Sequence, residues 1–329
     1  MTQEQIIRWG ILGPGSIAHK FATGLQSLDD AKLVAVGSRA LESANAFADR
    51  YGATNRHAGY EALVNDPDVD AIYVATPHSF HQEHTELCLR AGKAVLCEKP
   101  FAINRTQAES MVATARSTGV FLMEAMWTRF LPLLLRVGEL VAAGEIGDIR
   151  MLWSDFGFRT NVNPQSRLFD MNLGGGGLLD VGIYPVSLAS LLLGQPNRIA
   201  TMADLGETGV DEQAGIILGY PGTQMALLAT AVRTSTPMET TILGTLGQIR
   251  IHSPSWCPTK MTLTNVKGTS ELIDVPFLGN GYNYEAAEVG RCLRAGLKES
   301  PHMPLDETLA VMGTLDAIRA QWGLRYPME

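Results

Sequence analysis

The 329-residue sequence contains no run of about 18 or more apolar residues, so we expect no segment that spans a bilayer. Its amino terminus shows no basic region followed by an apolar stretch and a cleavage site, and no secretory leader is expected. Basic residues number 26 against 34 acidic ones, and no cluster of lysine or arginine is longer than two residues. We therefore expect a cytoplasmic protein that binds neither a membrane nor nucleic acid.

Cysteine is also scarce. The four cysteines lack the paired spacing of a disulfide framework or a zinc site, and we expect reduced thiols that serve in packing. Hydrophobic residues make up 46% of the chain and charged residues 18%, as in a soluble globular protein. Because 329 residues exceed what one core typically supports, the length predicts two domains, or one domain with a large appendage.

Near its start the sequence has the pattern of a strand, a glycine turn and a helix. The apolar run 6–12 is followed by Gly-x-Gly-x-x-Ala and then by a helical pattern. In such a turn the glycines let the backbone approach a pyrophosphate, and the helix N terminus supplies N–H donors. The spacing alone is a weak signal, but its context favours a dinucleotide site. The turn residues expected to bind the cofactor are Gly13, Gly15, Ser16 and Ile17.

Strands and helices then alternate, which predicts a parallel, doubly wound α/β sheet. Further strands are expected at 32–37, 70–75 and 93–97, and helices at 41–51, 79–91 and 104–119.

From residue 149 onward, strands follow one another without helices between them, which predicts an antiparallel sheet. We therefore divide the chain into a dinucleotide-binding domain, 1–124, and an α+β substrate-binding domain, 125–329. The last helix, 306–322, is a candidate to pack back on the first domain. The strands of the second domain are expected at 149–158, 214–220, 224–233 and 240–251.

The end of the second strand bears on the choice of cofactor. An NAD-specific site usually has an acid there to bind the ribose hydroxyls, but this chain has Ser38 and Arg39 and no acid before Glu42. An arginine can pair with a 2'-phosphate, so the sequence favours NADP(H) over NAD(H). A solvated loop position for Arg39 is the alternative.

Three residues form a candidate proton-transfer site. Asp180 and Tyr184 are four positions apart in an expected helix and should project from the same face. Lys99 follows a strand of the first domain. A tyrosine that titrates at about 10 is a poor base, but a lysine ammonium in contact with it favours the phenolate. The trio predicts alcohol oxidation or carbonyl reduction. The alternatives are structural: Tyr184 as a half-buried, hydrogen-bonded tyrosine, and Lys99 and Asp180 as surface residues.

The surroundings of this helix lead to two further expectations. The helix is expected to lie over the edge of the antiparallel sheet. The glycines at 174–177 precede it, and we expect them to leave room for substrate or for loop movement.

Taken together, the glycine turn, Glu98-Lys99-Pro100 and Asp180-x-x-x-Tyr184 resemble the glucose-fructose oxidoreductase / inositol dehydrogenase / MocA family over essentially the full length. The segments 123–130 and 174–184 look most like its dihydrodiol dehydrogenase and NADP-dependent xylose dehydrogenase branch. The resemblance implies a Rossmann domain, then an open, mostly antiparallel sheet whose other face often makes the oligomer contact, and hence a homodimer or homotetramer. It also implies Lys99 and Tyr184 as catalytic residues, with Asp180 beside them.

Other residues are candidates by their position. His78, His81 and His84 repeat every three residues, but this spacing drifts around a helix and no cysteine completes a zinc set, so no metal is expected. His78 and His81 should instead lie near the nicotinamide. The remaining cofactor candidates are Thr76, Pro77, Glu98, Lys99, Trp127 and Arg129, and the candidates for the substrate pocket are Arg159, Arg167 and Asp170.

The expected reaction is reversible hydride transfer between NADP(H) and a hydroxyl-bearing carbon of a small sugar or polyol, with an aldose 1-dehydrogenase as the leading hypothesis. A trans-dihydrodiol dehydrogenase or dicarbonyl reductase would use the same machinery with a more apolar pocket. An oxidoreductase that keeps its cofactor bound between two sugars is a third hypothesis. A non-catalytic NADP-binding regulator is the alternative from another class.

Overall fold

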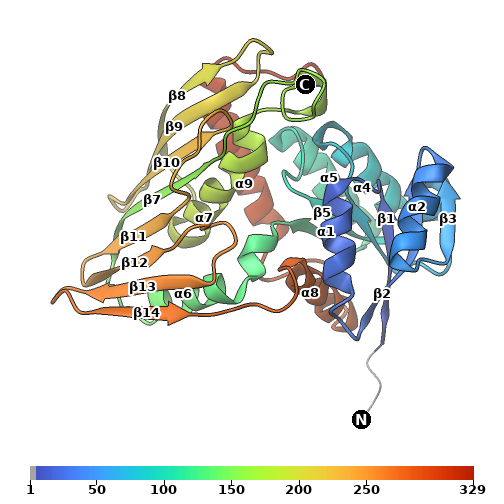
Figure 1. Ribbon diagram of the computed structural model, residues 1–329, viewed down its shortest axis with the longest axis horizontal. Coiled ribbons are helices and arrows are strands. Elements are labelled where there is room, and N and C mark those ends of the chain that lie inside the picture. The colour runs from blue at the N-terminus through green and yellow to red at the C-terminus, as the bar shows by residue number, and fades with distance from the viewer. Residues whose placement is uncertain (1–4) are drawn as a thin grey trace. The chain divides into compact units, whose positions relative to one another are not determined.

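The computed structural model describes residues 5–329, which form two compact units (Figure 1). The first unit contains the chain up to Trp127 and a later segment, Leu278–Leu309. The second unit contains Thr128–Phe277 and Ala310–Glu329. The chain therefore returns to the first unit before it ends in the second.

The first unit is built on a six-stranded sheet with the strand order β3-β2-β1-β4-β5-β6. Every strand pair in it is parallel. The inner strands are apolar and buried along their length, as expected of a parallel sheet covered on both faces. The strands are β1 Ile7–Leu12, β2 Ala31–Ser38, β3 Asn55–Ala58, β4 Ala71–Val74, β5 Ala94–Glu98 and β6 Leu122–Ala125.

The helices between these strands begin and end at residues that favour such boundaries. In α5, for example, the Asn104 side chain accepts a hydrogen bond from the Gln107 backbone N–H (2.8 Å), and the helix ends at Gly119 in the left-handed conformation. The α-helices of this unit are α1 Ser16–Leu25, α2 Leu41–Tyr51, α3 Tyr60–Val64, α4 His81–Arg90, α5 Arg105–Thr118 and α8 Tyr282–Arg294, and a 3₁₀ turn, η1 His78–Phe80, precedes α4.

The second unit is built on an eight-stranded sheet with the order β14-β13-β12-β11-β7-β10-β9-β8. Only one interior pair, β7 with β10, is parallel among these described strands. The mixed sheet is therefore mostly antiparallel, which confirms the predicted fold class. Its strands are β7 Ile149–Gly157, β8 Arg198–Leu205, β9 Asp211–Gly219, β10 Met225–Ala231, β11 Thr240–Gly244, β12 Gly247–Ile251, β13 Lys260–Asn265 and β14 Ser270–Asp274.

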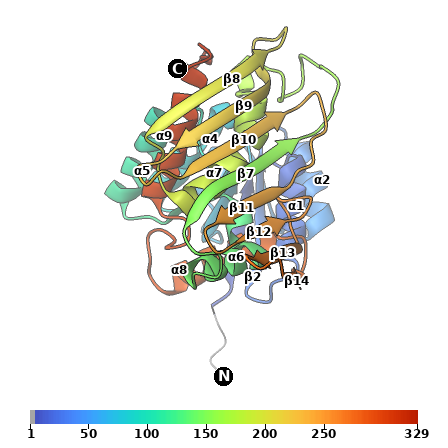
Figure 2. The same cartoon turned by 90° about the vertical axis from the view of Figure 1, so that its left-hand side faces the viewer.

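One face of this sheet is covered by helix, as Figure 2 shows with α7 behind the strands. A π-helical turn, η4 Leu178–Gly182, runs directly into α7 Ile183–Leu193, and both pack against β7 and β10. The expectation that this helix lies over the sheet edge is therefore wrong, because β7 and β10 are interior strands. The other helical segments are η2 Trp127–Phe130, α6 Pro132–Ala142, η3 Met171–Leu173 and α9 Leu305–Ala320.

The stretch Met171–Leu193 is long and apolar enough, by length and composition, to cross a membrane. However, 78% of its most apolar window is buried inside the structure. Its apolar side chains are therefore used in packing against the sheet, as in the core helix of a globular unit.

Candidate active site

The glycine turn of the first unit fits a pyrophosphate. Gly13 has a φ of +89°, and a Cβ there would lie 2.9 Å from the Thr76 Cγ2 atom, so only glycine suits this position. Gly15 is the N-cap of α1 and carries no side chain that could cover the first helical N–H groups. Those N–H groups, at the positive end of the helix dipole, are suited to hold an anionic group. Ser16 and Ile17 open this helix as expected.

The end of β2 presents the residues that were expected to select the cofactor. Ser38 is buried, and its hydroxyl accepts a hydrogen bond from the Ala40 N–H (3.3 Å). Arg39 is exposed, and its guanidinium donates a hydrogen bond to the Tyr60 hydroxyl. Tyr60 comes from α3, a helix that the sequence pattern did not predict. No sequence pattern indicates Tyr60, because the polar strand β3 and the five-residue helix α3 are too short to show periodicity.

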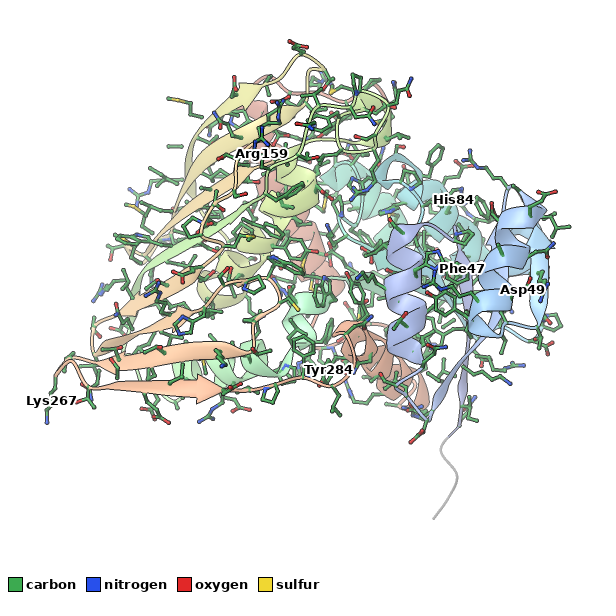
Figure 3. All side chains as sticks on the ribbon, in the orientation of Figure 1. Phe47, Asp49, His84, Arg159, Lys267 and Tyr284 are labelled. Atoms are coloured by element: carbon green, nitrogen blue, oxygen red, sulfur yellow. The ribbon has the colours of Figure 1, made fainter. Side chains whose placement is uncertain are left out.

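His84 completes this cluster (Figure 3). Its ring lies edge-on to Tyr60, with 4.6 Å between the ring centroids, and its Nδ1 atom is 3.0 Å from the Thr76 Oγ1 atom. Burial and, to a smaller extent, the positive charge of Arg39 lower the pKa of His84 to about 4. His84 is therefore neutral at physiological pH, and Arg39 supplies the positive charge of the cluster.

His81 joins the ends of two neighbouring strands. It is fully buried, with Nδ1 2.8 Å from the Pro100 carbonyl oxygen and Nε2 2.8 Å from the Thr76 carbonyl oxygen. Burial lowers the pKa of His81 to about 4, so the ring is neutral and donates its one N–H to one of these carbonyls. The His78 ring lies edge-on to it at 5.7 Å. Among residues 5–329, no group of three or more His, Cys, Asp or Glu side chains is arranged to hold a metal ion.

Lys99 follows β5 and is half-buried. Its backbone N–H donates to the carboxylate of Glu98 (3.0 Å), which also accepts a hydrogen bond from the Tyr73 hydroxyl. The carboxyl group of Glu285, on α8, is fully buried near Glu98, and burial together with the charge of Glu98 holds its pKa well above the usual range. Glu98 is thus directed into the unit, where its contacts fix the backbone that carries Lys99.

Trp127 and Arg129 are both buried, and each has a packing role. Trp127 stacks on Tyr282 with 4.5 Å between the ring centroids. Arg129 lies in the second unit, where it donates to the Ser187 hydroxyl (2.9 Å) and to the Ser187 carbonyl (2.8 Å). Arg129 therefore helps to fix helix α7.

Asp180 and Tyr184 lie in the second unit. Asp180 is buried and accepts a hydrogen bond from Arg167 at 2.9 Å, an ion pair that brings one predicted substrate residue to the site. The expectation of a regular α-helix from Asp180 to Tyr184 is wrong, because Leu178–Gly182 forms a π turn. Such a turn accommodates an extra residue, and π turns occur frequently at functional sites.

The Tyr184 side chain lines a small pocket together with Ser154, Phe156, Thr240 and Trp256. Phe156 lies 5.4 Å from the Tyr184 ring, and Trp256 stacks on Phe156 at 5.5 Å with an interplanar angle of 8°. The Ser154 and Thr240 hydroxyls bond to each other (2.6 Å). Phe156 and Trp256, which sequence reasoning missed, therefore give the pocket an aromatic wall beside Tyr184.

None of the three predicted substrate residues lines this pocket, and Arg159 and Asp170 lie apart from Asp180 as well. Arg159 is exposed and lies in an isolated bridge with Arg233 (Figure 3). Asp170 is the N-cap of η3, where its carboxylate accepts the Asn172 N–H (2.8 Å). Both have local structural roles.

The glycines at 174–177 are buried and hydrogen-bonded, contrary to the expected room for movement. Gly176 donates to the Leu168 carbonyl (2.8 Å) and Gly175 to the Asp170 carbonyl (3.0 Å). A Cβ at Gly175 would lie 2.6 Å from the Leu168 carbonyl oxygen. Glycine is needed here because the backbone segments pack closely, not because the loop moves.

Two family sequence profiles match the chain. One, described as the oxidoreductase family with an NAD-binding Rossmann fold, matches residues 7–126, and the other, the GFO/IDH/MocA C-terminal domain, matches residues 134–250. The chain belongs to the GFO/IDH/MocA oxidoreductase family. This membership confirms the resemblance read from the sequence. The protein is an enzyme, an oxidoreductase with an NAD(P)-binding Rossmann domain.

Several named enzymes are similar to this chain over nearly its full length. The chain is 40% identical to trans-1,2-dihydrobenzene-1,2-diol dehydrogenase of Mus musculus over 335 residues, which cover 98% of the chain and 99% of the relative. It is 37% identical to the Homo sapiens protein of the same name, with the same coverage.

Solved GFO/IDH/MocA structures have the same fold. A 3-ketoreductase from Actinomadura kijaniata, in complex with NADP and TDP-benzene, is 26% identical, with a TM-score of 0.87 and coverage of 96% of this chain and 98% of that one. Variants of that ketoreductase with a lysine changed to alanine and a tyrosine changed to phenylalanine have also been solved. An aldose-aldose oxidoreductase from Caulobacter crescentus is 25% identical, with a TM-score of 0.89 and coverage of 97% and 98%.

Proposed function

We propose that the protein is an NADP-dependent dehydrogenase that oxidises a CH–OH carbon in a six-membered ring with adjacent hydroxyls, and that a trans-dihydrodiol is its favoured substrate. The observation that carries the proposal is the aromatic wall of Phe156 and Trp256 beside Tyr184. Such a wall suits the apolar face of an unsaturated ring, because aromatic side chains offer a large apolar surface for contact. The curated relatives at 36–40% identity, which are named for a dihydrodiol, support it.

Tyr184 is proposed to take the proton of the substrate hydroxyl. Lys99 is proposed to hold the same substrate oxygen and to favour the phenolate form of Tyr184 by its positive charge. Asp180, paired with Arg167 at 2.9 Å, would keep one carboxylate oriented beside the reacting hydroxyls. A lysine and a tyrosine are also the residues changed in the variants of the Actinomadura ketoreductase.

The cofactor proposed is NADP(H). When bound, NADP⁺ supplies the acceptor for the hydride of the substrate carbon. The turn at Gly13 and Gly15 would hold its pyrophosphate, and Arg39 with Ser38 would bind its 2'-phosphate. The exposed, positively charged Arg39, oriented by Tyr60, supports this preference, since an arginine can form two parallel hydrogen bonds to phosphate.

A second candidate substrate is an aldose, oxidised at C1, as first expected from the sequence. The likeness to the aldose-aldose oxidoreductase of Caulobacter crescentus favours it. Both candidates need the same proton and hydride transfer, and they differ in how many hydroxyls the pocket must satisfy.

A substrate panel tests the proposal. NADPH formation would be followed by its absorbance with trans-dihydrodiols, aldopentoses, aldohexoses and inositols, with NAD⁺ in parallel. We expect the highest kcat/KM for a trans-dihydrodiol with NADP⁺. Activity confined to aldoses would select the second candidate. A protein that binds NADPH but oxidises none of these substrates would contradict the proposal and favour a regulator.

We also propose a homo-oligomer formed through the open face of the eight-stranded sheet. Apolar side chains on that face are unusually exposed, among them Trp153 on β7 and Ile217 on β9. The strand register aligns both of them with Leu227 of β10, which makes a continuous apolar row across three strands. An apolar patch of this kind is typical of a surface that another protein chain covers.

A further inference from the structure

Asp211 lies directly beneath the glycines that precede the Asp180–Tyr184 segment. It begins β9 and is fully buried. One carboxylate oxygen accepts the backbone N–H of Leu178 at 2.6 Å, which is the first residue of the π turn. A Cβ added to Gly176 would collide with the other carboxylate oxygen. The glycine run is therefore closed around this carboxylate.

Tyr326, near the end of the chain, reaches the same glycines from another side. Its buried hydroxyl donates a hydrogen bond to the Gly175 carbonyl at 2.6 Å. The terminal segment is itself fixed, because Glu329 pairs with the buried Arg319 and accepts the Tyr326 backbone N–H at 2.9 Å. The Arg319 guanidinium also lies 5.4 Å from the centre of the Tyr326 ring.

Thr230 of β10 makes a third contact, from its hydroxyl to the Gly177 carbonyl at 3.3 Å. Side chains from three different segments therefore bond to Gly175, Gly177 and Leu178, and these contacts fix the start of the π turn relative to the sheet. Two residues into that turn lies Asp180, and Tyr184 follows one turn later.

We propose that Asp211 and Tyr326 are positioning residues for the reaction: together they clamp the glycines at 174–177 and so fix the segment that carries Asp180 and Tyr184. This inference rests on the proposed role of Tyr184 in proton transfer. Neither side chain needs to touch substrate. Small errors in position at a reacting group are costly, because about 1 Å of misplacement can cost roughly a hundredfold in rate.

The charge of Asp211 is part of the clamp. Burial raises the pKa of Asp211 to about 7, and the N–H groups of Leu178 and Gly177 oppose this rise by favouring the anion. The Tyr326 hydroxyl faces Asp211, and Arg319 and Glu329 face Tyr326 in turn. Of the other charged groups nearby, Asp180 is paired with Arg167, and Glu212 with Arg233. The anion, which accepts N–H groups most strongly, therefore predominates above a pH of about 7 and is lost below it.

The test compares Tyr326→Phe and Asp211→Asn with two matched controls. Tyr220→Phe removes a buried hydroxyl of the same unit that has no hydrogen-bond partner among residues 5–329. Glu212→Gln neutralises the neighbouring carboxylate. For Tyr326→Phe we expect a fall of about tenfold in kcat, with KM and NADPH affinity unchanged, and unchanged kinetics in both controls. Faster hydrogen exchange in the peptide spanning 174–182 is expected as well.

For Asp211→Asn we expect the loss of the wild-type decline in kcat below a pH of about 7, because asparagine does not titrate. Unchanged hydrogen exchange at 174–182 in Tyr326→Phe, or an acid decline that persists in Asp211→Asn, would overturn the inference. Hydrogen exchange does not require turnover. If the wild-type protein is inactive but hydrogen exchange at 174–182 still responds to Tyr326→Phe, the proposed function is refuted and the clamp stands. If the wild-type protein is active but the exchange does not respond, the clamp alone is refuted.

Discussion

At the scale of single residues, the orientation of Arg39 depends on its neighbours. Its position after β2 was evident in the sequence, but its orientation depends on Tyr60, which comes from the unpredicted α3. His84 contacts Tyr60 and is neutral, since its pKa lies at about 4. The positive charge of Arg39 is therefore held at the end of β2 by Tyr60, and the neighbouring His84 adds no second charge.

Changing Arg39 to Asp should weaken NADP⁺ binding by roughly a hundredfold, about 3 kcal/mol, because a charge-assisted pair is replaced by repulsion. NAD⁺ binding should change by less than about threefold, within the small range of exposed charge effects. Dissociation constants measured by titration for both cofactors provide the check. Arg116→Asp, at an exposed ion pair with Asp306 in the same unit, serves as the control. Equal losses for the two cofactors would contradict the assignment of Arg39.

The buried segment 178–184 illustrates what the sequence could not specify at the residue scale. The four-residue spacing of Asp180 and Tyr184 was evident, but the π turn was not. The first N–H of that turn bonds to Asp211, which is 33 positions after Leu178 in the chain and contacts it only in the folded unit. The glycines were likewise interpreted as flexible, because nothing local shows that Leu168 and Asp211 pack against them.

At the scale of elements, the sequence predicts best those structures that depend on local residues. The cap of α5 at Asn104 and the left-handed end at Gly119 follow from neighbouring residues, and the buried strands β1, β4 and β5 follow from their apolar runs. The polar edge strand β3 did not show a pattern, because its residues alternate between half-buried and exposed positions without apolar periodicity.

The open face of the eight-stranded sheet leads to a prediction at this scale. Trp153→Glu places a charge in the apolar row of β7, β9 and β10, where half of the tryptophan surface (51%) is exposed. If this face joins two copies of the chain, burying an unpaired charge should weaken the dimer by at least about tenfold. Sedimentation velocity over a concentration series measures the effect.

Lys267→Glu, at the exposed tip of the β13–β14 hairpin (Figure 3), is the matched control for that charge change. It should leave the assembly unchanged. A wild-type protein that sediments as a monomer at all concentrations, or a Trp153→Glu variant that assembles normally, would refute the proposed oligomer contact.

At the scale of the whole molecule, the two units divide the chemistry between them. The first unit carries the glycine turn, Arg39 and Lys99, which are proposed to serve the cofactor and the substrate oxygen. The second unit carries Asp180, Tyr184 and the aromatic pocket. The cofactor half was predictable from the sequence because its motif is contiguous. The pocket was not, since Phe156, Tyr184 and Trp256 meet only through the fold.

The most direct test of the account is the turnover of Tyr184→Phe with NADP⁺ and the best substrate of the panel, alongside its affinity for NADPH. If Tyr184 takes the substrate proton, kcat should fall by roughly a hundredfold or more, since proton transfer by a positioned side chain contributes about that much. NADPH should bind as to the wild-type protein. Tyr220→Phe should retain full turnover. Near-normal turnover in Tyr184→Phe would contradict the proposed mechanism.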